Sequence, residues 1–258
     1  MPELKSPDFH NSAAEDHGME QQLFDTLIEH GYAINSSDRA NCSALVGETT
    51  HSIPCPPVII QCFQLPALEY LNAKTETMQL LYLAEENPEL MTYQGMERVA
   101  QVAQHYMTWK ENLYAGVEGG LVLNKLSWNP TEINKMGGFV KPNDFVRHAH
   151  RLGMRFGVYT IYDSRETNGE DCDLTPDCGG NSKEAEMNYF LGMGVDSLFV
   201  ENVAESREIL LRFEQTLILE REWSEAVGNA GVASYECSSL RVLGAALLTV
   251  VVAWSEVT

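Results

Sequence analysis

Basic residues are scarce in this sequence. Its 258 residues include 17 Lys and Arg against 37 Asp and Glu, which gives a formal net charge of −20. Nucleic acids and anionic membrane surfaces both attract clustered Lys and Arg. The charge therefore argues against nucleic acid as a main partner and against broad adsorption to an anionic membrane. It does not exclude a small anionic substrate, because one lysine and a bound divalent cation can reverse the field locally.

Long hydrophobic runs are also missing. The apolar segment 242–254 is short for a membrane span, which needs roughly 20 residues. It follows small residues and a polar spacer, an order typical of a glycosylphosphatidylinositol attachment signal. A core helix and unselected sequence from a mispredicted exon are alternative interpretations. We expect a folded domain over residues 1–216 and a tail over residues 217–258, with membrane attachment through the tail as one interpretation.

The opening residues are polar, and we therefore expect no signal peptide at this position. Asn-x-Ser sequons begin at Asn35 and Asn41, and two pairs of cysteines lie in polar loops. Such cysteines suit disulfides in an oxidising compartment or free thiols. A secretory location and chance occurrence of the sequons both stay open.

Strand-like and helix-like segments alternate along the chain. Helical spacing indicates one long helix with Met96, Val99, Ala103, Tyr106 and Met107 on one side. Apolar strand patterns cover residues 2–5, 58–63, 78–83, 119–123, 155–161 and 195–200. Alternation of this kind predicts an α/β fold with a parallel sheet. No glycine-rich phosphate fingerprint follows any strand, which favours a barrel over an open nucleotide-binding sheet.

Glu3 and Lys5 stand two residues apart on the first strand-like segment. Residues spaced in this way point to the same face of a strand. If that face is a barrel interior, both side chains reach the C-terminal rim, where barrel active sites are built. The carboxylate offers an oxygen ligand for Ca²⁺ or Mg²⁺, and the ammonium offers a donor for phosphate. An ordinary exposed pair at the N-terminus is the alternative.

Five segments in order resemble the glycerophosphodiester phosphodiesterase family. They read PELKSP, PVIIQCF, MQLLYL, FVRHAHRLGMRFGVYTIYD and YFLGMGVDSLFVEN, and together they span roughly residues 2–210. The resemblance implies a TIM-type (β/α)₈ barrel in which the Glu3–Lys5 strand is the third. Strands three to eight are then present and the first two are missing. We expect a truncated gene model; the alternative is that a partner or the tail covers the gap.

The resemblance also implies roles for individual residues. Glu3 matches a metal ligand, and Lys5 matches a phosphate contact. Gln61 and Phe63 fall where the family lines its substrate pocket, and Tyr159 with Thr160 match its aromatic-Thr pair. Glu201 stands where the family usually has Asp, which puts the role of the closing strand in doubt. The implied cofactor is a divalent cation, Ca²⁺ or Mg²⁺, and the implied partner is a small-molecule glycerophosphodiester.

The proton-transfer motifs of that family do not occur in this sequence. It contains no His-Arg-Gly, no His-Asp and no Glu-x-Asp triplet. In the family, two histidines act as general acid and base beside the metal, and each is a large rate term. We therefore expect a phosphoric diester hydrolase of lipid metabolism by family, with weak or no activity in this chain alone. The alternative is a non-catalytic, membrane-associated protein that keeps part of the glycerophosphoryl pocket.

Overall fold

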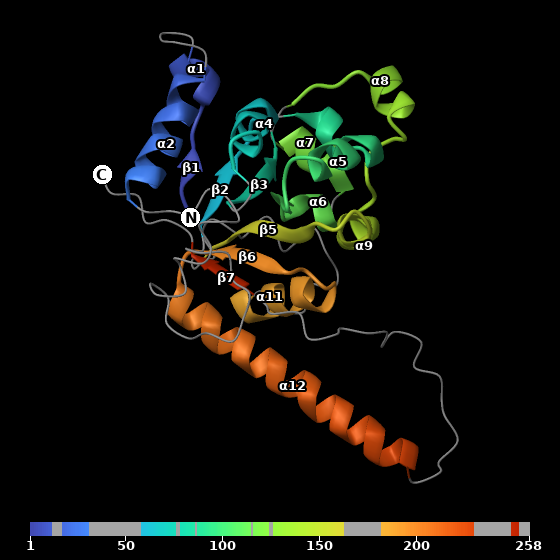
Figure 1. The fold of residues 1–258 in the computed structure, drawn as a ribbon. Helices are drawn as coiled ribbons and strands as arrows, with labels where there is room; N and C mark the ends of the chain where they lie inside the picture. The colour runs from blue at the N-terminus through green and yellow to red at the C-terminus, as the bar shows by residue number, and fades with distance from the viewer. Residues whose placement is uncertain are drawn as a thin grey trace. The chain divides into compact units, whose positions relative to one another are not determined.

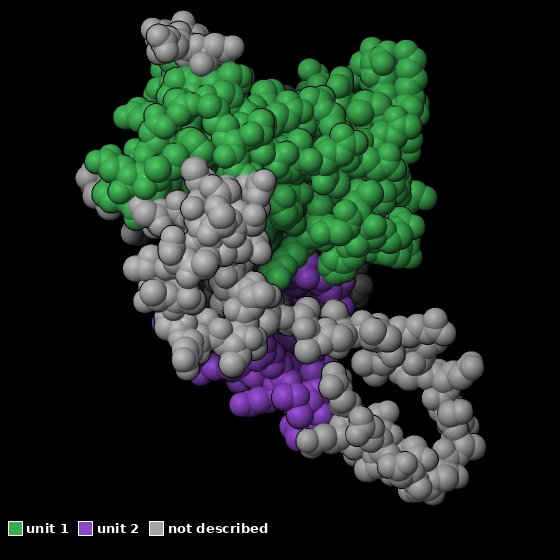
Figure 2. All heavy atoms as spheres, viewed as in Figure 1, with its two compact units in different colours: residues 1–159 green, residues 160–258 purple. Residues whose placement is uncertain are grey.

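The computed structural model describes residues 1–11, 17–30, 58–75, 78–85, 87–114, 116–123, 126–162, 182–229 and 249–252. They belong to two compact units, residues 1–159 and residues 160–258 (Figure 2).

The first unit is built on parallel strands taken in sequence order. They are β1 (Glu3–Leu4), β2 (Ile59–Cys62), β3 (Gln79–Ala84), β4 (His105–Trp109) and β5 (Arg155–Ile161), the last of which runs into the second unit. Each strand pairs in parallel with the next one. A doubly wound sheet reverses its strand order at a switch point, whereas a barrel keeps strands in sequence order. This order is therefore that of a barrel.

Contacts across strands show that the sheet curls. Phe63 directly follows β2 and Tyr159 lies in β5, yet their ring centroids are only 6.2 Å apart. Neighbouring strands are spaced about 4.8 Å apart, so three strand steps in a flat sheet would separate them by about 14 Å. The two side chains can meet only if the strands bend toward each other on this face. The fold is thus an α/β half-barrel compatible with part of a TIM-like barrel, while the strand count and barrel numbering stay predictions.

Helices connect these strands. They are α1 (Pro7–Asn11), α2 (Gly18–Glu29), α4 (Leu65–Asn72), η1 (Pro88–Met91), α5 (Tyr93–Ala100), α6 (Glu111–Tyr114), α7 (Gly116–Leu123), α8 (Pro130–Lys135), η2 (Pro142–Asp144) and α9 (Phe145–Arg151). Short polar side chains cap several of them, because the first backbone N–H groups of a helix lack partners. Thr92 accepts from Gly95 N at α5, and Asn129 accepts from Thr131 N at α8. Figure 1 shows α4 beside β2 and β3.

An aromatic cluster fills the space between the sheet and α9. Tyr82, Tyr106 and Phe156 are paired across β3, β4 and β5, so they share one face. The centroids of Tyr106 and Phe156 are 6.0 Å apart, and Phe145 of α9 lies 5.6 Å from Phe156. All four side chains are fully buried. This face is the helix-covered side of the half-barrel, and Phe63 and Tyr159 lie on the other, concave face.

Two expected elements are wrong. The expected long helix through Tyr106 and Met107 ends at Ala100, and β4 begins at His105. Both faces of β4 are buried, so its apolar residues do not alternate, and a short apolar run fits helix or strand equally well. Residues 119–123, expected as a strand, belong to helix α7. There Gly120 lies against α6, since an added Cβ would stand 1.8 Å from Asn112 Oδ1.

The second unit contains α11 (Lys183–Gly192), β6 (Ser197–Val200), α12 (Val203–Asn229) and β7 (Thr249–Val252). The strands β6 and β7 pair in parallel. Residues 249–252 are therefore strand, and the core-helix interpretation of segment 242–254 is wrong at these positions. The division expected after residue 216 stays a prediction, and α12 runs through this position. In the part of the chain that the structure describes, no helix is long and apolar enough to cross a membrane.

Candidate functional site

Glu3 and Gln61 lie side by side at the first strand pair. They are register partners on β1 and β2, and Gln61 Nε2 donates a hydrogen bond to Glu3 Oε2 over 3.3 Å. Glu3 is half-buried, and Gln61 is only 6% exposed. Lys5 follows β1 directly and is exposed. Ser6 then takes a left-handed φ of 49°, and Pro7 begins α1.

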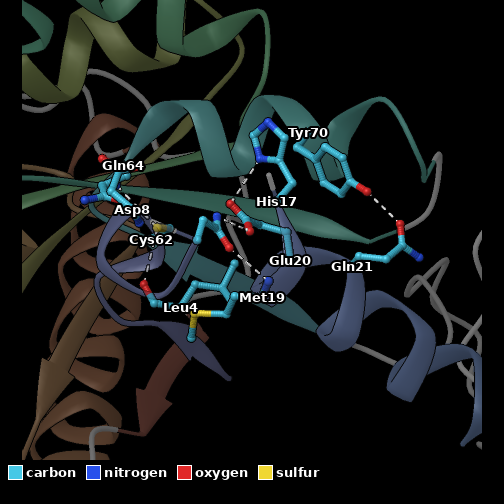
Figure 3. Close-up of polar contacts among 10 residues, drawn as sticks. Leu4, Asp8, His17, Met19, Glu20, Gln21, Cys62, Gln64 and Tyr70 are labelled. Atoms are coloured by element: carbon cyan, nitrogen blue, oxygen red, sulfur yellow. Dashed lines mark hydrogen bonds and ion pairs between the residues drawn. The ribbon is translucent and has the colours of Figure 1, made fainter. Parts of the chain in front are cut away.

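Since β1 has only two residues, other contacts must hold Glu3 in place. Cys62 Sγ donates to Leu4 O over 3.3 Å, and Gln61 N donates to Pro2 O over 3.0 Å. Asp8 N at the start of α1 donates to Gln64 Oε1 over 3.1 Å, as Figure 3 shows. Both ends of β1 are therefore tied to β2, and Glu3 stands on a fixed backbone.

The same figure shows what holds the following helix. Buried Glu20 of α2 accepts from Asn11 Nδ2 and lies 3.3 Å from His17 Nδ1. His17 stacks on Tyr70 of α4 with ring centroids 4.4 Å apart. The α1–α2 hairpin is thus docked onto α4, which supports the chain that leaves β1.

Gln61 carries a second feature of interest. Its Oε1 atom is buried and accepts no hydrogen bond from the described residues. A buried acceptor without a partner costs about 1–3 kcal/mol. This unpaired amide oxygen lies on the same side chain that contacts the carboxylate of Glu3. The two groups together suit a ligand that carries a hydrogen-bond donor or a positive charge.

Phe63, Tyr159 and Glu85 form the other end of the concave face. The rings of Phe63 and Tyr159 meet edge to face, and Tyr159 Oη donates to Glu85 Oε2 over 3.4 Å. Burial raises the pKa of Tyr159 well above its ordinary value of 10.0, and the Glu85 carboxylate raises it further. The hydroxyl therefore stays protonated and acts as a donor at neutral pH.

This shifted pKa of Tyr159 predicts a pH dependence of stability. A pKa raised by folding stabilises the protein fully below the unfolded pKa, and that contribution is lost as pH rises toward the folded pKa. The difference in unfolding free energy between wild type and Tyr159→Phe should therefore be constant near neutral pH. Above about pH 10, the unfolding free energy of wild type should fall relative to that of Tyr159→Phe. Urea unfolding of both proteins at about pH 8 and about pH 11 measures it. An identical difference at both pH values would contradict this account.

The structure groups the predicted site residues only in part. Glu3 contacts Gln61, and Phe63 contacts Tyr159, all on the concave side of the first unit. Lys5 is two residues after Glu3 in the chain. Thr160 is half-buried and, as the neighbour of Tyr159 in β5, points to the opposite face. The functional roles of all six residues stay predictions.

Sequence reasoning missed the polar residues that follow β3 and β4. Glu85 follows β3 and accepts the hydrogen bond from Tyr159. Lys110, Glu111 and Asn112 follow β4 and are 0–1% exposed. Polar groups at the C-terminal ends of parallel strands are the usual material of active sites. They escaped notice because β4 was expected to be a helix, so its end was not recognised.

A divalent cation requires oxygen ligands. Among residues 1–11, 17–30 and the other described segments, no group of three or more His, Cys, Asp or Glu side chains is placed to hold a metal. The Glu3 carboxylate and the buried Gln61 amide oxygen are, however, hard oxygen donors that fit Ca²⁺ or Mg²⁺. The residues present thus fit one side of a cation site.

The fold and this geometry define an α/β half-barrel protein with a polar and aromatic concave face. Neither a protein-family model nor a curated protein matches the sequence. The resemblance to glycerophosphodiester phosphodiesterases therefore stays a prediction.

Proposed function

We propose that this protein binds glycerophosphodiesters on the concave face of the half-barrel and takes part in their hydrolysis. The observation that supports this most is the hydrogen bond of 3.3 Å from Gln61 Nε2 to Glu3 Oε2, with Lys5 two residues after Glu3. An anionic oxygen and an ammonium side by side can hold a phosphodiester together with its counter-ion. This site lies at strand ends, as in barrel enzymes.

Each of the expected residues has a role in this proposal. Glu3 holds a divalent cation, and Lys5 donates to a non-bridging phosphate oxygen. Phe63 and Tyr159 line the pocket for the remainder of the substrate. The cation, when bound, neutralises charge on the phosphate and acts as a Lewis acid. In the reaction, water adds to phosphorus and gives up a proton, the bond from phosphorus to the alcohol oxygen breaks, and the leaving oxygen takes up a proton, so that glycerol 3-phosphate and the alcohol are released.

Proton transfer is the weak part of the site. The sequence has no His-Arg-Gly or His-Asp motif, and the side chains assigned to the site are carboxylates, an amide, a phenol and the ammonium of Lys5. General acid and base groups contribute typically 10²–10⁴-fold each. We therefore expect the protein to bind glycerophosphodiesters but to hydrolyse them slowly. A binding protein without turnover is the second candidate function, and the same motif absence favours it.

Substitutions of Glu3 and Lys5 test the proposed binding of the phosphodiester. Glu3→Gln and Lys5→Met should each weaken binding of glycerophosphocholine in the presence of Ca²⁺ by roughly 10- to 100-fold, because hydrogen bonds to charged groups contribute about 1.5–3 kcal/mol. Isothermal titration calorimetry on the 258-residue chain measures the binding, and released glycerol 3-phosphate measures turnover.

Two exposed residues serve as matched controls. Glu29 lies at the end of α2, and Lys135 forms a surface pair with Glu132; Glu29→Gln and Lys135→Met should bind as wild type does. Binding that neither Glu3→Gln nor Lys5→Met weakens would overturn the proposal. Turnover that Glu3→Gln abolishes supports the hydrolase, and binding without turnover supports the second candidate.

A further inference from the structure

We propose that Gln61 is itself a cation ligand through its amide oxygen, and that Glu3 and Gln61 together form an oxygen site that prefers Ca²⁺ to Mg²⁺. The inference rests on the proposed function, in which Glu3 holds a divalent cation. It changes the role of Gln61 from lining the substrate pocket to binding the cation.

The strand pair fixes the geometry of this site. Glu3 and Gln61 are register partners, and the hydrogen bond from Gln61 Nε2 to Glu3 Oε2 orients the planar amide against the carboxylate. Gln61 Oε1 belongs to the same amide group, so it stands within a few ångströms of that carboxylate. The amide nitrogen thereby positions the carboxylate while the amide oxygen remains available as a ligand.

The burial of this oxygen is the reason to expect a ligand. Gln61 is 6% exposed, and its Oε1 receives no hydrogen bond within the described part of the chain. A hydroxyl could satisfy Oε1 alone. A cation would satisfy Oε1 and also bind the adjacent anionic oxygens of Glu3, which favours a cation over a neutral donor.

The type of oxygen indicates which cation. Ca²⁺ accepts amide and backbone carbonyl oxygens readily, in flexible geometry at about 2.3–2.6 Å. Mg²⁺ demands near-ideal octahedral geometry at about 2.0–2.1 Å, keeps several waters and is usually held through carboxylates. An amide oxygen on a rigid strand therefore adds more to Ca²⁺ binding than to Mg²⁺ binding.

Calorimetric titration of the full 258-residue protein with Ca²⁺ and with Mg²⁺, without any phosphodiester, tests the inference. Gln61→Met keeps the length of the side chain and removes the oxygen, and it should weaken Ca²⁺ binding roughly tenfold while Mg²⁺ binding changes less. Gln61→Glu retains an oxygen at this position and should bind Ca²⁺ at least as tightly as wild type. Gln22→Met on the exposed side of α2 is the control and should leave both affinities unchanged.

Glu3→Gln separates failure of this inference from failure of the proposed function. If Glu3→Gln loses Ca²⁺ binding while Gln61→Met retains wild-type affinity and preference, Gln61 is not a ligand and the proposed function stands. If Gln61→Glu loses Ca²⁺ binding, the inference is likewise overturned. If Glu3→Gln and Gln61→Met both bind Ca²⁺ as wild type does, no cation site exists here, and both the inference and the cation role of Glu3 in the proposed function are overturned.

Discussion

Phe156→Ala is expected to lower the free energy of unfolding of the first unit by about 3–5 kcal/mol, the usual cost of removing a buried phenyl ring. Phe156 is 0% exposed. It stacks on Tyr106 at an interplanar angle of 17° and contacts Phe145 of α9. The truncation would open a cavity between sheet and helix and remove the ring contact between β5 and β4. Urea unfolding followed by tryptophan fluorescence measures the change.

Phe9→Ala is the matched control for this substitution. Phe9 is 73% exposed in α1, so the same change of side chain should alter stability by less than about 0.5 kcal/mol. A loss below about 1 kcal/mol for Phe156→Ala would show that the aromatic cluster is not packed in this way.

Gly95→Ala is expected to destabilise the protein by about 2–3 kcal/mol, the upper part of the range for overpacking. An added Cβ would stand 2.1 Å from the backbone oxygen of Glu89 and 2.6 Å from the Cα of Leu90. These are backbone atoms of η1, so a side-chain rotation cannot relieve the clash. The oxygen of Glu89 also accepts from Thr92 Oγ1, and Thr92 Oγ1 accepts from Gly95 N. Shifting either segment would therefore break the cap of α5 as well.

Gly192→Ala on α11 is the matched control, and we expect it not to destabilise the protein. Gly192 ends α11, and an added Cβ would meet no heavy atom within 4 Å. Replacing a helical glycine by alanine normally gains about 0.5–1 kcal/mol, so this variant should be as stable as wild type or more stable. Thermal unfolding of both variants gives the comparison. A Gly95→Ala protein as stable as Gly192→Ala would contradict the close approach of α5 and η1.

The strands that the sequence predicted well share one property. The runs at 58–63, 78–83 and 155–161 are apolar, and flanking turns or helices bound them clearly; they appear as β2, β3 and β5. The run at β4 failed because it follows helix α5 after four residues and continues its apolar character. Only tertiary contacts show that this run is a strand. One of them is the 2.7 Å hydrogen bond between His105 Nε2 and Gln79 Oε1.

The candidate site was predictable to a smaller extent. Sequence order places Glu3 and Gln61 on neighbouring strands, but only the register shows that they are direct partners. The contact between Phe63 and Tyr159 depends on the curl of the sheet, which no local pattern encodes. Glu85 lies in the acidic run that follows β3, where a single carboxylate on the concave face has no distinguishing signal in the sequence.

We propose that Lys5, together with a cation on Glu3 and Gln61, binds the phosphate of a glycerophosphodiester. A crystal structure of the full chain grown with glycerol 3-phosphate and Ca²⁺ tests it most directly. The account predicts the phosphate beside Lys5, with the cation between it and the oxygens of Glu3 and Gln61. A phosphate bound elsewhere on the protein, with this pair unchanged at saturating ligand, would contradict it.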